Sequence, residues 1–216
     1  MKQLLFSSLM VLLLLSSCTD TVNDIVDSTI TANQKKDEVL QAAKQDFSSD
    51  AEIAAIYGRN VSQSGEVDLL NLENAFVYVV QSDIMQSNEF YVPVFGAGPI
   101  KSPINFDAML QLVKDTTAAN ILGTVFGTLA TASIDPAANY DDSPLAVQTA
   151  LINGGSAFIT QNTNTKIDML LVPSKSIDST SIINSADWII NFYSDSNSLV
   201  LWINSESGIV TTLSGN

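Results

Sequence analysis

Histidine is absent from this 216-residue chain, and cysteine occurs once, at Cys18. Without histidine, the chain cannot build Ser-His-Asp or Cys-His nucleophile systems, histidine general bases or nearly any zinc site. With one cysteine it cannot form an intramolecular disulfide, so its fold must depend on a hydrophobic core. Glycoside hydrolysis by two carboxylates and Ser-Lys catalysis need no histidine. The absence therefore narrows the enzyme classes without excluding an enzyme.

Basic residues are also scarce. The chain has 9 Lys and Arg against 23 Asp and Glu, which gives a net charge of −14. Such a protein is repelled by nucleic acid phosphates and by anionic lipid head groups, so we expect neither as a partner. Charged residues make up only 15% of the chain, and uncharged polar residues carry much of its solubility, as is common in exported domains.

The N-terminus carries the most specific motif. The apolar run from Leu4 to Leu15 follows Lys2 and is too short for a transmembrane helix, which needs about 20 residues. It ends in Leu15-Ser16-Ser17-Cys18, which resembles the signal box of bacterial lipoproteins: an aliphatic residue, two small residues and a cysteine. The resemblance implies that residues 1–17 are a signal peptide and that Cys18 becomes lipidated, with diacylglycerol and fatty acids such as palmitate. The alternative is an ordinary signal peptide that happens to hold a cysteine.

Thr19 follows this cysteine where an aspartate would retain many lipoproteins at the inner membrane. The position is similar to that in lipoproteins sent to the outer membrane. We therefore expect a membrane anchor in the cell envelope, on the periplasmic or the surface face of the outer membrane.

The mature chain is predicted to be α+β, with two duplicated helix-plus-antiparallel-sheet units. Residues 18–32 form a lipidated tether, residues 33–97 the first unit and residues 143–216 the second. The units are joined by residues 98–142, a helical connector rich in small residues. Residues 105–113 are predicted as a short helix, and residues 118–133 as a segment that packs on the sheet rather than a membrane-spanning one.

The second unit ends in a predicted meander from Asp187 to Leu213. Trp188, Ile190 and Phe192 alternate with other residues, which is the period of a strand, and Ser, Asp, Asn and Gly separate three apolar runs. A helix at residues 144–160 precedes it. In the first unit, a helix at residues 33–47, capped by Asn33, likewise precedes the predicted strands.

The evidence for duplication is a shared pattern. The hairpin of residues 75–80 and 90–95 resembles the first hairpin of the meander, and residues 53–57 match residues 167–171. That match favours a strand for residues 51–57, which are otherwise ambiguous with a helix. Pro93 has no amide to donate, so its strand is expected at an edge or with a bulge. Chance similarity between short alternating patterns is the alternative.

The C-terminal unit also resembles PepSY-like domains, in which a helix precedes a curled antiparallel sheet. The resemblance rests on Trp188 to Phe192, Leu199 to Asn204 and Ser207-Gly208-Ile209-Val210. The segment Asn204-Ser205-Glu206 departs from the usual Asp-Ala-x-Thr-Gly turn of those domains. The resemblance implies an envelope module that binds or restrains a partner.

Residues that suggest chemistry are few. Asp141-Asp142 and Asp195-x-Asn197 lack the ligand alternation, glycine and distal glutamate of a calcium loop and are predicted to be turns. Ser174-Lys175-Ser176 is predicted to be a solvated turn. We therefore predict no catalytic residue, no metal site and no cofactor.

Aromatic residues are the candidate ligand-binding residues. Four residues, Tyr78, Tyr91, Trp188 and Trp202, could form a platform, of which Tyr78, Tyr91 and Trp202 are the candidates for ligand binding. Aromatic residues on strands more often belong to the core. Trp188 shares one face of its strand with apolar residues and is predicted to be buried against the helix. Trp202 is predicted to be more exposed, on the side of the sheet away from the helix.

Two functions remain open from the sequence. The first is a non-catalytic, lipid-anchored envelope protein that binds a protein, peptide or glycan. The second is a carboxylate-dependent hydrolase of cell-wall or polysaccharide material, which requires two carboxylates about 5–10 Å apart in a cleft.

Overall fold

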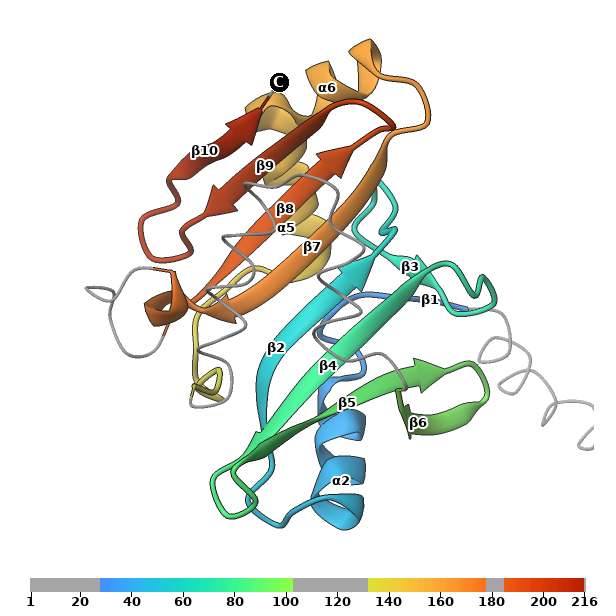
Figure 1. The fold of residues 1–216 in the computed structure, drawn as a ribbon, viewed down its shortest axis with the longest axis vertical. Coiled ribbons are helices and arrows are strands. Elements are labelled where there is room, and N and C mark those ends of the chain that lie inside the picture. The colour runs from blue at the N-terminus through green and yellow to red at the C-terminus, as the bar shows by residue number, and fades with distance from the viewer. Residues whose placement is uncertain (1–27, 103–131, 178–184, 216) are drawn as a thin grey trace, which may run out of the picture.

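An antiparallel sheet of eight strands forms the centre of the molecule (Figure 1). The computed structural model describes residues 28–102, 132–177 and 185–215. The strand order is β10-β9-β8-β7-β2-β4-β5-β6, and the predicted α+β class is confirmed. The strands are β2 (Glu52–Arg59), β4 (Ala75–Ser82), β5 (Ser87–Val94), β6 (Ala97–Lys101), β7 (Lys166–Pro173), β8 (Ala186–Tyr193), β9 (Ser198–Ile203) and β10 (Val210–Gly215).

The two halves of the sheet have the same connectivity. In the first, helix α2 (Lys36–Asp46) precedes the meander β2-β4-β5-β6. In the second, α5 (Ser143–Ala150), a kinked stretch η1 (Leu151–Gly155) and α6 (Ser156–Gln161) precede β7-β8-β9-β10. The leading strands β2 and β7 pair in the middle of the sheet. This is the topology that the predicted duplication requires, while a common origin stays a prediction.

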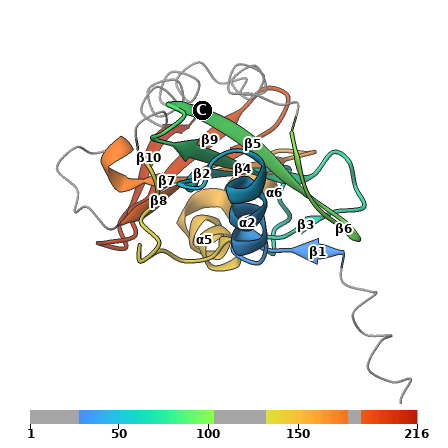
Figure 2. The same cartoon turned by 90° about the horizontal axis from the view of Figure 1, so that it is seen from below.

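The helices α2 and α5 lie on the same face of the sheet (Figure 2). Val39 and Ala43 are buried on the sheet-facing side of α2, whose last turn carries Lys44 in the place that favours a cation. The predicted cap at Asn33 is wrong, because α2 begins at Lys36. The Asn33 side chain instead accepts a hydrogen bond of 2.9 Å from the Tyr140 hydroxyl.

The predicted helix of residues 144–160 is broken in two. Gly154 has φ +121°, a conformation that ends the helical path and that glycine adopts without strain. At the adjacent Gly155, a Cβ atom would lie 2.4 Å from the Phe192 ring. The helical segment thus approaches the sheet more closely than any larger residue would permit.

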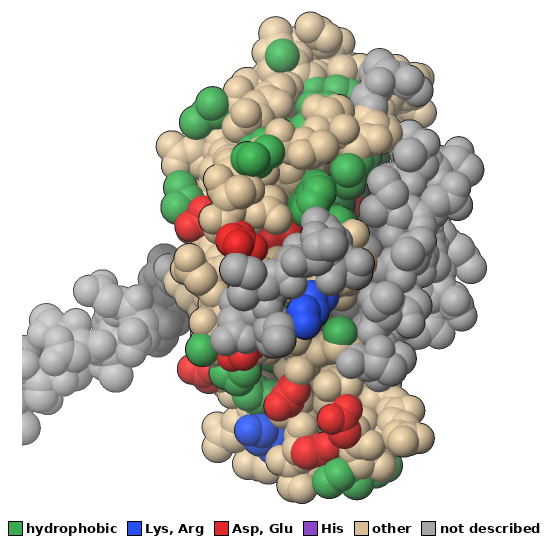
Figure 3. Space-filling view, turned by 90° about the vertical axis from the view of Figure 1, so that its left-hand side faces the viewer, with side chains coloured by type: hydrophobic (Ala, Val, Ile, Leu, Met, Phe, Trp, Pro, Cys, Tyr) green, Lys and Arg blue, Asp and Glu red, His purple; other side chains and the backbone are tan. Residues whose placement is uncertain are grey.

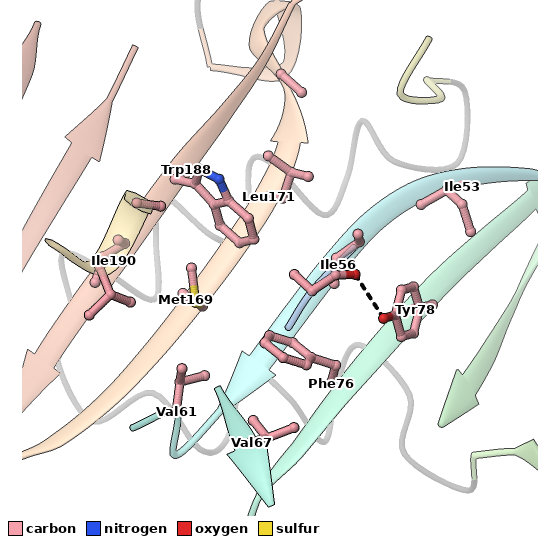
Figure 4. Packing of buried hydrophobic residues seen from close by; sticks show 14 of the residues in the cluster. Ile53, Ile56, Val61, Val67, Phe76, Tyr78, Met169, Leu171, Trp188 and Ile190 are labelled. Atoms are coloured by element: carbon pink, nitrogen blue, oxygen red, sulfur yellow. Dashed lines mark hydrogen bonds between the residues drawn. The ribbon is translucent and has the colours of Figure 1, made fainter. Parts of the chain in front are cut away.

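Core side chains join the two halves of the sheet at β2 and β7, where the backbone pairing between the halves is short. Only three residue pairs link β2 to β7, from Ile56↔Leu171 to Gly58↔Met169, whereas β7 and β8 pair along their whole length. Trp188, Leu171 and Ile56 form a row across β8, β7 and β2 in the same buried cluster (Figure 4). All three are 0% exposed, so side-chain packing supplements the short hydrogen-bonded contact.

The predicted domain boundaries need two corrections. Residues 98–101 belong to strand β6, so the first sheet extends into the predicted helical connector. The tether prediction is also too long, because Thr29–Ile30 forms strand β1, which pairs with β3 (Val67–Asp68) in a small second sheet. The predicted helix at 105–113 and most of the small-residue segment at 118–133 lie outside the described residues.

Pro93 lies at an irregularity rather than an edge. The register between β5 and β6 shifts between Val92 and Val94, as expected for a bulge, and β6 is the edge strand beside it.

On the side of the molecule shown in Figure 3, acidic side chains are more widespread than basic ones, in keeping with the net charge of −14.

Candidate functional site

A polar pocket lies where the two halves of the sheet meet. We call it the junction pocket; its volume is about 310 Å³. The end of β2, the start of β7 and the end of β8 contribute its walls, together with the loop before β4. Its lining residues are Arg59, Asn60, Glu73, Asn164, Lys166, Tyr193, Ser194 and Asp195.

Two cations that form no ion pair within the described part of the chain line this pocket. The ion pairs within the described residues join Lys35 to Glu38 and Lys101 to Glu89, and neither Arg59 nor Lys166 takes part in one. In a chain with only 9 basic residues, two cations in one pocket are an uncommon concentration. A guanidinium and an ammonium at one site attract a carboxylate or phosphate.

The wall behind the pocket is held by a buried carboxylate, Asp168, which is 5% exposed. The Tyr57 hydroxyl donates to its Oδ2 at 2.7 Å, and the Asn60 amide donates to its Oδ1 at 2.8 Å. The Tyr193 hydroxyl lies 3.4 Å from the same Oδ1. These bonds fix two residues of the pocket wall, Asn60 and Tyr193, relative to the sheet.

Burial raises the pKa of Asp168, although the hydrogen bonds and the nearby Arg59 partly offset this by favouring the charged form. Burial, followed by the charge of Asp168, also raises the pKa of Tyr57 and of Tyr193. Both phenols therefore stay protonated at neutral pH. They can donate hydrogen bonds and cannot act as bases.

Two asparagines of the pocket have left-handed backbones. Asn60 has φ +50° and Asn164 has φ +57°. Asparagine tolerates this region better than most residues. They lie directly after β2 and two residues before β7, where the chain must turn sharply at the sheet end. Strained residues cluster at binding and catalytic sites, which is consistent with a functional role here.

The arrangement is suited to binding a polar ligand. Arg59 and Lys166 can hold an anionic group, and the amides of Asn60 and Asn164 can bind hydroxyl or amide groups. The carboxylates of Glu73 and Asp195 can accept hydrogen bonds from an amine or a sugar hydroxyl.

A second pocket, of about 170 Å³, lies between α2 and the segment before α5. Its apolar part includes Leu40, Ile53, Ile134 and Pro136, and charged residues such as Lys44 surround it. It can hold a small apolar group, whereas every residue that lines the junction pocket is polar or charged.

The predicted aromatic platform is not formed. Tyr78 and Tyr91 are both 0% exposed; they pair across β4 and β5 in the core beneath α2, and the Tyr78 hydroxyl donates to the Ala32 carbonyl. Trp202 lies opposite Ile189 on the other face of the sheet, in β9, with three strands between it and β4. The prediction placed all three on one surface; strand alternation puts them on two.

The two tryptophans behave as predicted in their relative exposure. Trp188 is 0% exposed, and its indole N–H donates to the Asp141 carbonyl at 2.8 Å. Trp202 is partly exposed, but its indole N–H donates at 2.9 Å to Asp187, a carboxylate that is 0% exposed. Trp202 therefore has a structural bond that its sequence pattern did not indicate.

Other predicted features can be located only in part. Cys18 lies outside the described residues. Within residues 28–102, 132–177 and 185–215, no cluster of acidic residues could hold a metal ion, and no helix there is long and apolar enough to cross a membrane.

The junction pocket was not predicted from the sequence, because its lining residues come from four separate segments of the chain. Two signals pointed to it. Asp168 is a single acidic residue inside an apolar strand, and Arg59 is the only arginine of the chain.

Comparison of the chain with protein-family models, curated proteins and solved structures finds no match.

Proposed function

We propose that this chain is a lipid-anchored protein of the bacterial cell envelope that binds a small polar ligand, without catalysis, in the junction pocket. The anchor rests on Leu15-Ser16-Ser17-Cys18 and its resemblance to the lipoprotein signal box. The binding role rests on one observation: Arg59 and Lys166, unpaired within the described residues, line a pocket built by both halves of the sheet.

The ligand has an anionic group beside hydroxyl or amide groups. An acidic sugar of an envelope glycan has this chemistry, and so does the C-terminal end of a peptide. Arg59 binds the anion with its planar guanidinium, which matches the geometry of a carboxylate. Because the pocket lies at strand ends and is braced by Asp168, little ordering is needed on binding.

The binding test uses calorimetry with an oligosaccharide of uronic acids and with a short peptide that has a free C-terminus. Arg59→Ala and Lys166→Met should each weaken binding about tenfold or more, because a hydrogen bond to a charged group contributes about 1.5–3 kcal/mol. Lys175→Met is the matched control, since Lys175 lies outside the pocket. An equal loss in the control would mean a general charge effect, and no binding of either ligand would contradict the proposed ligand class.

The anchoring test uses detergent partitioning of the chain made in a bacterial host. The unaltered protein should enter the detergent phase, and Cys18→Ser should move it to the aqueous phase with its signal peptide uncleaved or cleaved elsewhere. Unchanged partitioning of that variant would remove the lipid anchor from the proposal.

A hydrolase is the second candidate, because Glu73 and Asp195 line the same pocket. Two carboxylates at one site are the minimum requirement for glycoside hydrolysis. Release of reducing ends from cell-wall glycan, lost in Glu73→Gln or Asp195→Asn, would replace the binding proposal with this one.

The resemblance to PepSY-like domains is compatible with the binding proposal. The segments that carry it fall in β8, β9 and the turn into β10, after a helical region. Membership of that family stays a prediction.

A further inference from the structure

Two leucines project from the loop that joins β3 to β4. We call residues 69–74 the leucine loop. Leu70 is 63% exposed and Leu72 is 95% exposed, whereas Leu69 packs against the main core. Single exposed apolar residues are common on protein surfaces. Two exposed leucines in one short loop, fixed in place as described below, form a small apolar projection.

Hydrogen bonds within the loop hold this shape. The Leu70 amide donates to the Asp68 carboxylate at 3.0 Å, and the Glu73 amide donates to the Asn71 side chain at 3.0 Å. The Asn71 and Asn74 amides donate to the carbonyls three residues earlier in the chain, at 3.1 Å and 3.0 Å. These Asx-type turns satisfy the backbone locally and leave the leucine side chains directed outward.

The loop is attached to the beginning of the described chain. The Leu69 amide donates to the Ser28 carbonyl at 2.8 Å, and β1 pairs with β3 through Thr29↔Asp68. Figures 1 and 2 both show the connection from β3 to β4 on the same side of the molecule as β1. Ser28 is ten residues after Cys18. Ten residues span at most about 33–36 Å, so the loop lies on the side of the domain that a lipid anchor would hold nearest to the bilayer.

We propose that the leucine loop inserts Leu70 and Leu72 into the head-group and upper acyl region of the lipid bilayer to which the protein is anchored. The inference rests on the proposed lipid anchor at Cys18. The anchor keeps the loop close to the bilayer, so a weak apolar contact is sufficient to orient the domain. Asp68 and Glu73 flank the leucines and are repelled by anionic lipids, so the surface that fits is a bilayer of zwitterionic lipids.

The test uses the full lipidated protein in phosphatidylcholine vesicles. In the lipidated protein the thiol of Cys18 is occupied by its thioether to diacylglycerol, so Leu72→Cys introduces a single free thiol for an environment-sensitive fluorophore. Ile84→Cys is the matched control: Ile84 is 69% exposed and lies beyond the other end of β4, about 26 Å away along eight strand residues. Nitroxide-labelled lipids in the vesicles quench a fluorophore that enters the bilayer.

We expect the Leu72 probe to be quenched at least twofold more than the Ile84 probe and its emission to shift to shorter wavelength. A protein that floats with the vesicles but shows equal quenching at both positions refutes membrane contact by the loop and leaves the anchor intact. A protein that does not float refutes the anchor, and the inference with it.

Discussion

Replacing Trp188 by alanine tests whether packing across the middle of the sheet holds the two halves together. Trp188 is 0% exposed and lies in the core cluster beside Leu171, which pairs with Ile56 where β2 and β7 are joined by only three residue pairs. Truncation of a buried tryptophan costs about 3–5 kcal/mol. The variant also leaves the Asp141 carbonyl without its 2.8 Å indole donor, which adds to the loss.

Trp202→Ala is the comparison. The Trp202 ring is partly exposed, so its removal loses less packing than that of Trp188. The substitution also removes the indole N–H that donates at 2.9 Å to the buried carboxylate of Asp187. A hydrogen bond to a charged group contributes about 1.5–3 kcal/mol. The Ser205 amide still donates to Asp187 at 2.9 Å, so we expect a loss at the lower end of that range.

The measurement is urea unfolding followed by circular dichroism, with both substitutions made in a Cys18→Ser chain without its signal peptide. We expect Trp188→Ala to lower the free energy of unfolding by about 3 kcal/mol or more, and Trp202→Ala by about half as much. Losses of equal size would mean that both indoles are core residues. A loss below about 1 kcal/mol for Trp188→Ala would refute the reasoning that this side chain joins the halves.

Two further substitutions test the pocket wall and the helical kink. Burial gives Asp168 a folded-state pKa above its unfolded value, so its contribution to stability falls as the pH rises from the unfolded to the folded pKa. Tyr57→Phe removes a 2.7 Å hydrogen-bond donor to the charged form of Asp168, so the loss of stability in thermal melts should be larger at pH 8 than at pH 4. A loss that does not depend on pH would contradict this prediction. Gly155→Ala places a Cβ 2.4 Å from a Phe192 ring atom and should cost about 1–3 kcal/mol, whereas Gly98→Ala, with open space around it, should change the melting temperature little; equal melting temperatures would show that the ring can move aside.

Glu73 connects the junction pocket to the leucine loop, because it lines the pocket and directly follows Leu72. If the leucine loop contacts the bilayer, the pocket lies close to the lipid surface. Ligand binding measured with and without vesicles would then differ in affinity, and L70S/L72S would remove the difference.

Periodic patterns predicted the elements well because they reflect local geometry. The alternation around Trp188 predicted a strand with that residue buried, and the match to residues 167–171 correctly favoured a strand for residues 51–57. The helix at residues 33–47 was also correct apart from its cap. The failures concern the boundaries: residues 98–101 form β6 because they find a partner in β5, which their own sequence does not indicate.

The predicted aromatic platform failed for a different reason. A period of two shows that alternate residues share a face, but it does not say which face another strand's residues take. Tyr78 and Tyr91 proved to lie beneath α2, while Trp202 lies on the opposite face of the sheet. Only the register between strands decides this.

The sequence by itself determined the α+β class, the absence of histidine chemistry and disulfides, and the strong acidic balance, because these follow from residue types and short-range periodicity. The tertiary structure decided the pairing of β2 with β7, which brings Arg59 and Lys166 together from positions more than a hundred residues apart. It also decided that Asp168 is buried and held by Tyr57. Such long-range contacts depend on how whole elements pack, and no local pattern in the chain encodes them.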